Sequence, residues 1–218
     1  MNLYLLRHGQ TNLNRYGKYQ GAVDKEINEL GKEQAELLGN RLKKYKIEVI
    51  YSSDHKRVMQ TSEIINKYIN TDIVIKEELR EINMGEWDTL SMEERYINNR
   101  DYADEWAKNL LDLPYPGGEC GADVYKRAGK VIDEIIGGKY KEVAIVTSGG
   151  TIAVLLSHFM GLEQHKRFNM EIDNCSISAV RYDANSKRIT VKCINDTGHL
   201  ENLICQDKKS NSGIKIEI

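Results

Sequence analysis

Arg7, His8 and Gly9 directly follow a short apolar run at the amino terminus, and they are residue types that can do nucleophilic chemistry. An unprotonated imidazole nitrogen is a nucleophile, and an arginine can hold a phosphoryl group by paired hydrogen bonds. Gly9 allows a sharp turn or a close approach to a ligand. The alternative is a strand-end pair that only caps a carbonyl and a carboxylate, so other stretches must decide.

Three further stretches carry groups that could complete such a site. Arg57 falls in the first turn of an expected helix, where a cation needs an anionic partner, either a carboxylate or a ligand. Glu81 has apolar neighbours that favour its partial burial. Ser148 and Gly149 lie in a glycine-rich turn between an apolar run and a helix, where free amides can bind an anion.

A polar segment from Asn12 to Asp24 follows the Arg-His-Gly turn. We expect it to form an irregular loop over the sheet edge. The amides of Asn14, Gln20 and Gly21 could bind phosphate oxygens there, or simply close turns.

Apolar patterning predicts the elements that position these groups. Runs of strand length and segments with helical spacing alternate along the chain. Strands are expected over residues 2–6, 48–51, 73–75, 143–146, 175–182 and 188–194, and helices after Asn28, after an N-cap at Ser53 or Asp54, over 91–113, over 122–136 and through Leu156.

This alternation predicts an α/β fold, a three-layer α/β/α sandwich with a mostly parallel central sheet and an antiparallel strand from the last hairpin. Ligands of open α/β sheets bind at the carboxyl ends of the strands, so the turns after the strands should share one site. We predict a single domain over residues 1–218. The irregular stretch 84–118 is its substrate-facing cover, and 206–218 form a tail whose alternating isoleucines could add an edge strand or contact a second copy in a homodimer.

Composition narrows the function classes. The 218 residues are 40% hydrophobic, enough for a full core, and the net charge of -2 gives no reason to expect nucleic acid or a membrane as partner. The four cysteines lie far apart without metal-ligand spacing, which fits reduced thiols in a cytoplasm. No apolar run reaches membrane-spanning length, and Arg7 interrupts the first run too early for a signal peptide.

Taken in order, Leu-Arg-His-Gly-Gln-Thr, Ser-Ser-Asp followed by Arg57, Glu81 and the Ser-Gly-Gly turn resemble the histidine phosphatase superfamily, which has the phosphoglycerate mutase-like fold. The resemblance runs from Asn2 to about Leu200. It implies that His8 is a nucleophile that becomes a phosphohistidine, that Arg7 and Arg57 hold the phosphoryl group, and that Glu81 donates a proton to the leaving oxygen. By the same resemblance, Asn14, Gln20 and Gly21 contact phosphate or substrate, and no metal or other cofactor is needed.

One position departs from the family pattern. The family motif normally reads Ser-His-Gly where this chain has Thr147-Ser148-Gly149. A serine can still donate one hydrogen bond, but it is shorter and uncharged, and losing one such donor typically costs about a hundredfold or more in rate. Three explanations stay open: a natural branch that works with serine, a substitution made to trap a ligand, or a protein that binds phosphorylated ligands without turnover. The first is favoured because serine commonly opens helices.

The spacing favours one reaction within the family. Only 35 residues separate Glu81 from Gly117, whereas the larger mutases carry extra chain there. The chain resembles small broad phosphatases and α-ribazole phosphatases, with Thr89 in place of a usual glycine. We therefore expect a phosphomonoester hydrolase that acts on a small phosphorylated metabolite. The alternatives are a non-catalytic phosphate-ligand-binding protein and a cofactor-dependent phosphoglycerate mutase.

Overall fold

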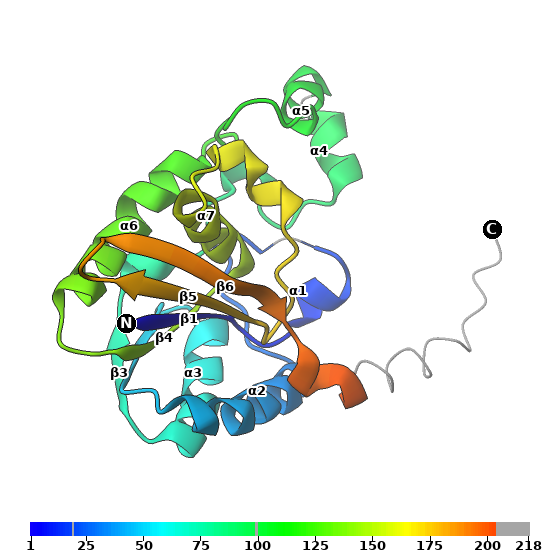
Figure 1. The fold of residues 1–218 in the computed structure, drawn as a ribbon. Coiled ribbons are helices and arrows are strands. Elements are labelled where there is room, and N and C mark those ends of the chain that lie inside the picture. Colours follow the sequence, from blue (N-terminus) through cyan, green and yellow to red (C-terminus); the bar gives the residue numbers. More distant parts are fainter. Residues whose placement is uncertain (19, 99, 204–218) are drawn as a thin grey trace.

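The computed structural model describes residues 1–18, 20–98 and 100–203, and its centre is one sheet of six strands in the order β3-β2-β4-β1-β5-β6 (Figure 1). The strands are β1 (Asn2–Arg7), β2 (Val49–Ser52), β3 (Asp72–Ile75), β4 (Glu142–Thr147), β5 (Ile177–Asp183) and β6 (Arg188–Asp196). β3, β2, β4 and β1 pair in parallel, and β5 pairs antiparallel with both β1 and β6. The predicted mostly parallel sheet with an antiparallel strand is confirmed, and β5 is that strand.

Helices cover both faces of the sheet, as the prediction of three layers requires (Figure 1). They are α1 (Asn12–Arg15), α2 (Glu29–Leu42), α3 (Lys56–Ile69), α4 (Met92–Asn98), α5 (Arg100–Ala107), α6 (Gly121–Gly137) and α7 (Gly149–Phe159). Short 3₁₀ turns span Lys43–Tyr45, Glu77–Leu79, Gly85–Trp87, Gln164–Asn169 and Gly198–Leu200.

The two core clusters follow the alternation of side chains along the strands. Leu3 and Leu5 of β1 pack in the cluster with α6 and α7, whereas Tyr4 and Leu6 pack in the cluster with α2 and α3. β4 lies between β1 and β2 and is buried on both faces, which explains its nearly continuous apolar sequence.

A third cluster anchors the segment that was expected to cover the site. Trp87 is 3% exposed, and its ring meets the rings of Tyr102, Trp106 and Tyr115 edge to face, with centroids 5.6 to 6.0 Å apart. Edge-to-face contact is a favourable geometry for aromatic rings. α4 and α5 extend from this cluster to one end of the molecule (Figure 1).

Four local predictions were wrong. The helix expected over 91–113 ends too late, because α5 stops at Ala107 and Asn109 has a left-handed backbone (φ 50°). The segment 12–24 is not wholly irregular, because Thr11 caps the short helix α1 and accepts a hydrogen bond from the Asn14 amide at 3.2 Å. The N-cap of α3 is His55 and not Ser53 or Asp54, since the Asp54 carboxylate pairs with the guanidinium of Arg80. β5 begins at Ile177, two residues later than expected, because Cys175 has a left-handed backbone (φ 55°).

Two expectations from the sequence concern membranes and the tail. Among the helices in the described part of the chain, none is long and apolar enough to cross a membrane. The expected tail, 206–218, lies outside the described residues.

Candidate active site

Three parallel strands bring the predicted site residues to one sheet edge. Arg7 at the end of β1 lies in register with Thr147 at the end of β4, and Ser52 of β2 is in register with Val146. The amide of His8 donates to Thr147 O at 3.0 Å, which ties the β1 turn to the β4 turn. The convergence predicted from the strand ends is therefore what the structure shows.

A cavity of about 380 Å³ opens at this edge. It is lined by seven of the nine residues predicted for the site: Arg7, His8, Asn14, Gln20, Gly21, Arg57 and Glu81. The cavity thus brings together the imidazole of His8, the guanidinium groups of Arg7 and Arg57 and the carboxylate of Glu81 from three separate segments.

His8 is held as a neutral imidazole. It is 3% exposed, and its Nδ1 lies 2.8 Å from the carbonyl oxygen of Gly9. A carbonyl can only accept, so the proton of the neutral ring resides on Nδ1 and Nε2 keeps a free lone pair. Burial lowers the pKa of His8 well below its usual value, and the charges of Arg57 and Arg7 lower it further.

Each of the two arginines keeps one nitrogen that no described residue binds. Arg7 donates from Nη1 to Ile172 O at 2.5 Å, and Arg57 donates to the carbonyls of Gly21 and Val23 at 3.0 and 2.7 Å. The Nε atoms of both side chains are buried and have no hydrogen-bond partner among the described residues. From its place in the first turn of a helix, Arg57 was expected to need an anionic partner. The two carbonyl oxygens accept hydrogen bonds but carry no charge, so they meet this need only in part.

Glu81 lies at the amino end of α7. Its carboxylate accepts from the amides of Ile82 at 2.8 Å and of Gly150 and Thr151 at 3.2 Å. The glycine-rich turn was predicted to bind an anion, and the anion that it binds is this side chain. A Cβ at Gly150 would come within 2.5 Å of Glu81 Oε1, so the contact requires glycine.

Ser148 and Gly149 do not line this cavity. Ser148 is the N-cap of α7 and fully buried, and its Oγ has no hydrogen-bond partner in the described part of the protein. Gly149 lines a second hollow of about 300 Å³ that shares Arg7, Glu81 and Met84 with the first. The rest of its lining is largely apolar and comprises Ile82, Tyr115, Gly150, Ala153, Arg167, Phe168, Met170 and Ile172.

The loop residues predicted to contact substrate are held by one another and by the cover. Gln20 donates from Nε2 to Thr11 Oγ1, which also accepts from the Asn14 amide. Gly21 has a left-handed backbone (φ 45°), and a Cβ there would overlap Asp88 of the cover segment. Burial raises the pKa of Asp88.

The site prediction left out five residues that line the cavity: Gly17, Lys18, Met84, Asp173 and Asn174. Asn174 donates from Nδ2 to His8 O at 2.9 Å and lies 3.3 Å from Asn14 Oδ1. The available signal was the polar pair Asp173-Asn174 just before β5, the strand beside β1. Among the residues that the structure describes, no group of three or more His, Cys, Asp or Glu side chains is placed to hold a metal ion.

Sequence comparisons agree with this geometry. Residues 3–197 match the model of the histidine phosphatase superfamily (branch 1). A putative phosphoserine phosphatase 2 of Hydrogenobacter thermophilus is 28% identical over 92% of this chain and 98% of its own length. A probable phosphoglycerate mutase GpmB of Erwinia tasmaniensis is 30% identical over 92% of this chain and 95% of its own length.

Solved structures share the fold. Bacillus stearothermophilus YhfR superimposes with a TM-score of 0.83 at 28% identity, covering 91% of this chain and 98% of that one. A mycobacterial glucosyl-3-phosphoglycerate phosphatase gives 0.80 at 26% identity over 90% and 99%. The predicted fold and family are confirmed: the chain belongs to branch 1 of the histidine phosphatase superfamily and is a phosphatase of that type.

Proposed function

We propose that this protein is a metal-independent phosphomonoester hydrolase that works through a phosphohistidine on His8. The observation that carries the proposal is the cavity where a buried neutral imidazole meets two arginines with unused Nε donors. Phosphoryl transfer needs an in-line nucleophile and fixed positive charge around the equatorial oxygens, and these groups meet both needs.

The first step transfers the phosphoryl group to His8. The Nε2 lone pair attacks phosphorus while the bond from phosphorus to the ester oxygen breaks, and Glu81 gives its proton to that oxygen. Burial keeps His8 unprotonated for the attack.

The second step returns the enzyme to its starting state. Water attacks phosphorus, the bond to Nε2 breaks, and the Glu81 carboxylate takes a proton from the water, so that inorganic phosphate leaves and His8 is neutral again. Glu81 lies within reach of both events because it lines the cavity together with His8. No electron transfer or further reactant is required.

Ser148 lines neither hollow, so in this proposal the turn after β4 shifts on binding and brings its hydroxyl to the phosphoryl group. Its buried hydroxyl has no partner within the described protein, and such a group is destabilising unless something else accepts from it. Because serine lacks the reach and charge of the family histidine, turnover should be slower than with an imidazole at this position.

The second hollow supports a substrate with an apolar leaving group. It adjoins the cavity at Arg7 and Glu81, and Tyr115, Phe168 and Met170 contribute apolar surface to its wall. An ester oxygen beside Glu81 would place the body of a small metabolite in that hollow. The relatives are named as a putative phosphoserine phosphatase and a probable phosphoglycerate mutase. An assay must therefore distinguish hydrolysis of a phosphate ester from its isomerisation.

The test is turnover of a panel of monoesters, including an aryl phosphate, phosphoserine and 3-phosphoglycerate. We expect phosphate release, and we expect His8→Ala to lower it at least about a thousandfold, because the covalent route is lost. Activity that persists in His8→Ala would contradict the proposal. Tight binding without hydrolysis would identify a phosphate-ligand-binding protein, and isomerisation of 3-phosphoglycerate without phosphate release would identify a mutase.

A further inference from the structure

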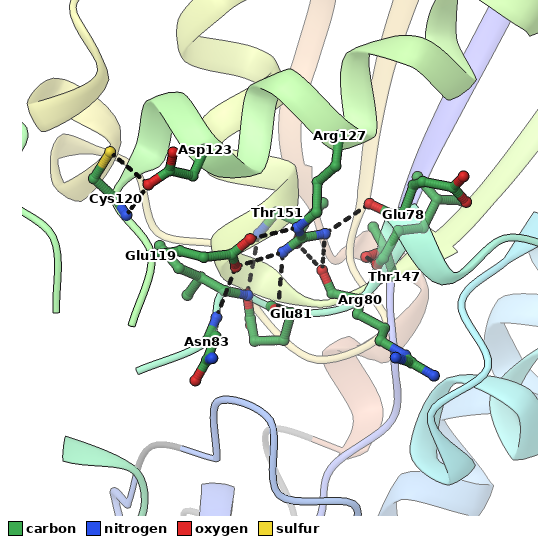
Figure 2. A network of polar contacts seen from close by, with 12 residues as sticks. Glu78, Arg80, Glu81, Asn83, Glu119, Cys120, Asp123, Arg127, Thr147 and Thr151 are labelled. Atoms are coloured by element: carbon green, nitrogen blue, oxygen red, sulfur yellow. Dashed lines mark hydrogen bonds and ion pairs between the residues drawn. The ribbon is translucent and has the colours of Figure 1, made fainter. Parts of the chain in front are cut away.

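Beyond one 3₁₀ turn, the backbone that carries Glu81 belongs to no helix or strand. It runs from the 3₁₀ turn Glu77–Leu79 through an irregular stretch to Met84. Carbonyls of such a segment need donors from elsewhere, and a segment that lacks them is mobile. Side chains of other elements fill this need at each residue from 78 to 81 (Figure 2).

Arg127 of α6 supplies most of these donors. Its Nη1 donates to Glu78 O at 2.6 Å and to Arg80 O at 2.7 Å, and its Nη2 donates to Glu81 O at 3.1 Å. Thr147 and Thr151 supply the others, through their hydroxyls, to Leu79 O at 2.5 Å and Arg80 O at 2.8 Å.

Glu119 fixes the guanidinium itself. Arg127 Nε donates to Glu119 Oε1 at 2.8 Å and Nη2 donates to Oε2 at 3.0 Å, a bidentate pair (Figure 2). Together with the three carbonyls, this pair uses all five N–H groups of the arginine. The two side chains are only 21% and 24% exposed, so the pair is partly shielded from water.

Glu119 also holds the chain after Glu81. Its Oε2 accepts from the Asn83 amide at 2.9 Å, and its own amide donates to Asn83 O at 2.9 Å. A Cβ at Gly118 would lie 2.3 Å from Asn83 O, so the Gly-Gly-Glu turn packs directly on this backbone. The backbone is thus fixed on both sides of Glu81, and its carboxylate reaches the amides of Gly150 and Thr151.

We propose that Arg127 and Glu119, here called the Arg127 clamp, are positioning residues that aim the Glu81 carboxyl group at the leaving oxygen. This inference rests on the proposed function for the role of Glu81. A surface ion pair would contribute little, but here one guanidinium binds the carbonyl of the acid-bearing residue itself. An acid displaced by a fraction of an ångström transfers its proton poorly, although the fold is unchanged.

The test compares Arg127→Lys and Glu119→Gln with Glu134→Gln. The last variant is a matched control on α6, because it removes a charge from the exposed Lys76–Glu134 ion pair (2.6 Å) without a bond to residues 78–81. Lysine keeps the charge of Arg127 but cannot bind three carbonyls and a carboxylate in one plane. Glutamine at 119 keeps the shape and loses an acceptor, and it provides a second variant if the lysine protein does not fold.

The kinetic readout depends on the leaving group. A nitrophenolate departs without a proton, whereas an alkoxide needs the acid. We expect both clamp variants to lower kcat/KM for an alkyl phosphate by about tenfold or more, with kcat/KM for p-nitrophenyl phosphate within about threefold of wild type. The ratio kcat/KM is compared because it covers the steps up to phosphoryl transfer and leaves out the hydrolysis of the phosphohistidine, in which Glu81 acts on either substrate. The control should match wild type on both substrates. Equal losses on the two substrates would overturn the proposal, because a general structural defect acts on both.

The structural readout needs no turnover. Amide hydrogen exchange at Gly150 and Thr151, which the Glu81 carboxylate binds, should accelerate in the clamp variants but not in the control. The Ile152 amide bonds to Ser148 O and is the internal reference. Unchanged exchange at Gly150 and Thr151 would refute the clamp whatever the activity. Absence of turnover in the wild type would refute only the proposed function.

Discussion

At the scale of single residues, Ser148 combines complete burial with an unused hydroxyl. Most buried polar groups are paired, and an unpaired one costs about 1 to 3 kcal/mol of stability. Ser148 opens α7 but does not cap it through its side chain, so local structure gives no reason for a hydroxyl here. A role toward bound phosphate is the reason we propose.

Ser148→Ala should separate stability from activity. Removing the unpaired hydroxyl should raise the unfolding free energy by about 1 kcal/mol, equivalent to about 3 °C in Tm for a domain of this size. Turnover of an aryl phosphate should fall by about tenfold or more if the hydroxyl donates to the phosphoryl group. Thermal unfolding and a phosphatase assay measure the two effects. Unchanged turnover would show that Ser148 takes no part in the reaction.

The roles of single residues could be predicted only where neighbours in the sequence define them. Arg7, His8 and Arg57 stand out because each ends or follows a strand or opens a helix, and Glu81 stands out by its apolar neighbours. The structure brings all four to one cavity. Asp173 and Asn174 line the same cavity, but no periodic pattern marks the stretch before β5. The contact between the Glu81 carboxylate and Thr151 spans 70 residues of sequence, and no local pattern encodes it.

At the scale of elements, it was easier to predict whether a segment forms a helix or a strand than to predict the residues at which it begins and ends. The periods of two and 3.6 residues identified every strand of the sheet and its long helices, because each buries one face or two. The start of α3 was predicted wrongly, since the Asp54 carboxylate binds Arg80 and the Lys56 amide is capped by Asp24 at 2.7 Å. Both partners come from other segments, which a local capping rule does not include.

Thr89 introduces strain into the cover segment. Its φ is 65°, in the left-handed region that is costly for a β-branched residue, and the family pattern has glycine at this position. The strain lies next to Asp88, whose carboxylate accepts from the Ala22 amide at 3.2 Å and so ties the cover to the loop that holds Gln20 and Gly21.

Thr89→Gly should therefore stabilise the protein. Relief of the left-handed conformation should outweigh the backbone entropy of glycine and raise the unfolding free energy by about 1 kcal/mol, or about 3 °C in Tm. Thr190→Gly within β6 is the control, and it should lower Tm because glycine weakens strands. Calorimetry on both variants decides the matter. A loss of stability at position 89 equal to that at 190 would mean that Thr89 is not strained.

At the scale of the whole molecule, the fold class followed from the alternation of strands and helices, whereas the strand order did not. Sequence places β4 last among the parallel strands, yet the sheet inserts it between β1 and β2. That insertion makes the turns after β1, β2 and β4 neighbours and so creates the site. It depends on which buried faces fit together, which is a property of the assembled core and not of any one segment.

The same core makes stability depend on pH through buried histidines. The pKa of His8 is lowered by burial first and then by the facing charges of Arg57 and Arg7, with His55 acting in the same sense. Partial loss of solvent also lowers the pKa values of His55, His158 and His199, of which His55 is buried, His199 is partly buried and His158 is exposed. Below about pH 6.5 the unfolded chain therefore binds protons that the folded protein does not, and the unfolding free energy falls as the pH falls.

Urea unfolding at pH 7.5, 6.0 and 5.0 measures this loss, and His8→Gln tests its largest source. Glutamine does not titrate, so the variant should lose at least about 1 kcal/mol less than wild type between pH 7.5 and 5.0. The paired carboxylates of Asp54 and Asp196 have lowered pKa values, and the stability that they contribute should be lost only below about pH 4. Superimposable curves for the two proteins above pH 5 would mean that His8 takes up its proton in the folded state as readily as in the unfolded chain. In that case His8 would be protonated in mildly acidic solution and could not attack phosphorus. Phosphatase activity should then fall over the same pH range in which the unfolding curves of the two proteins coincide.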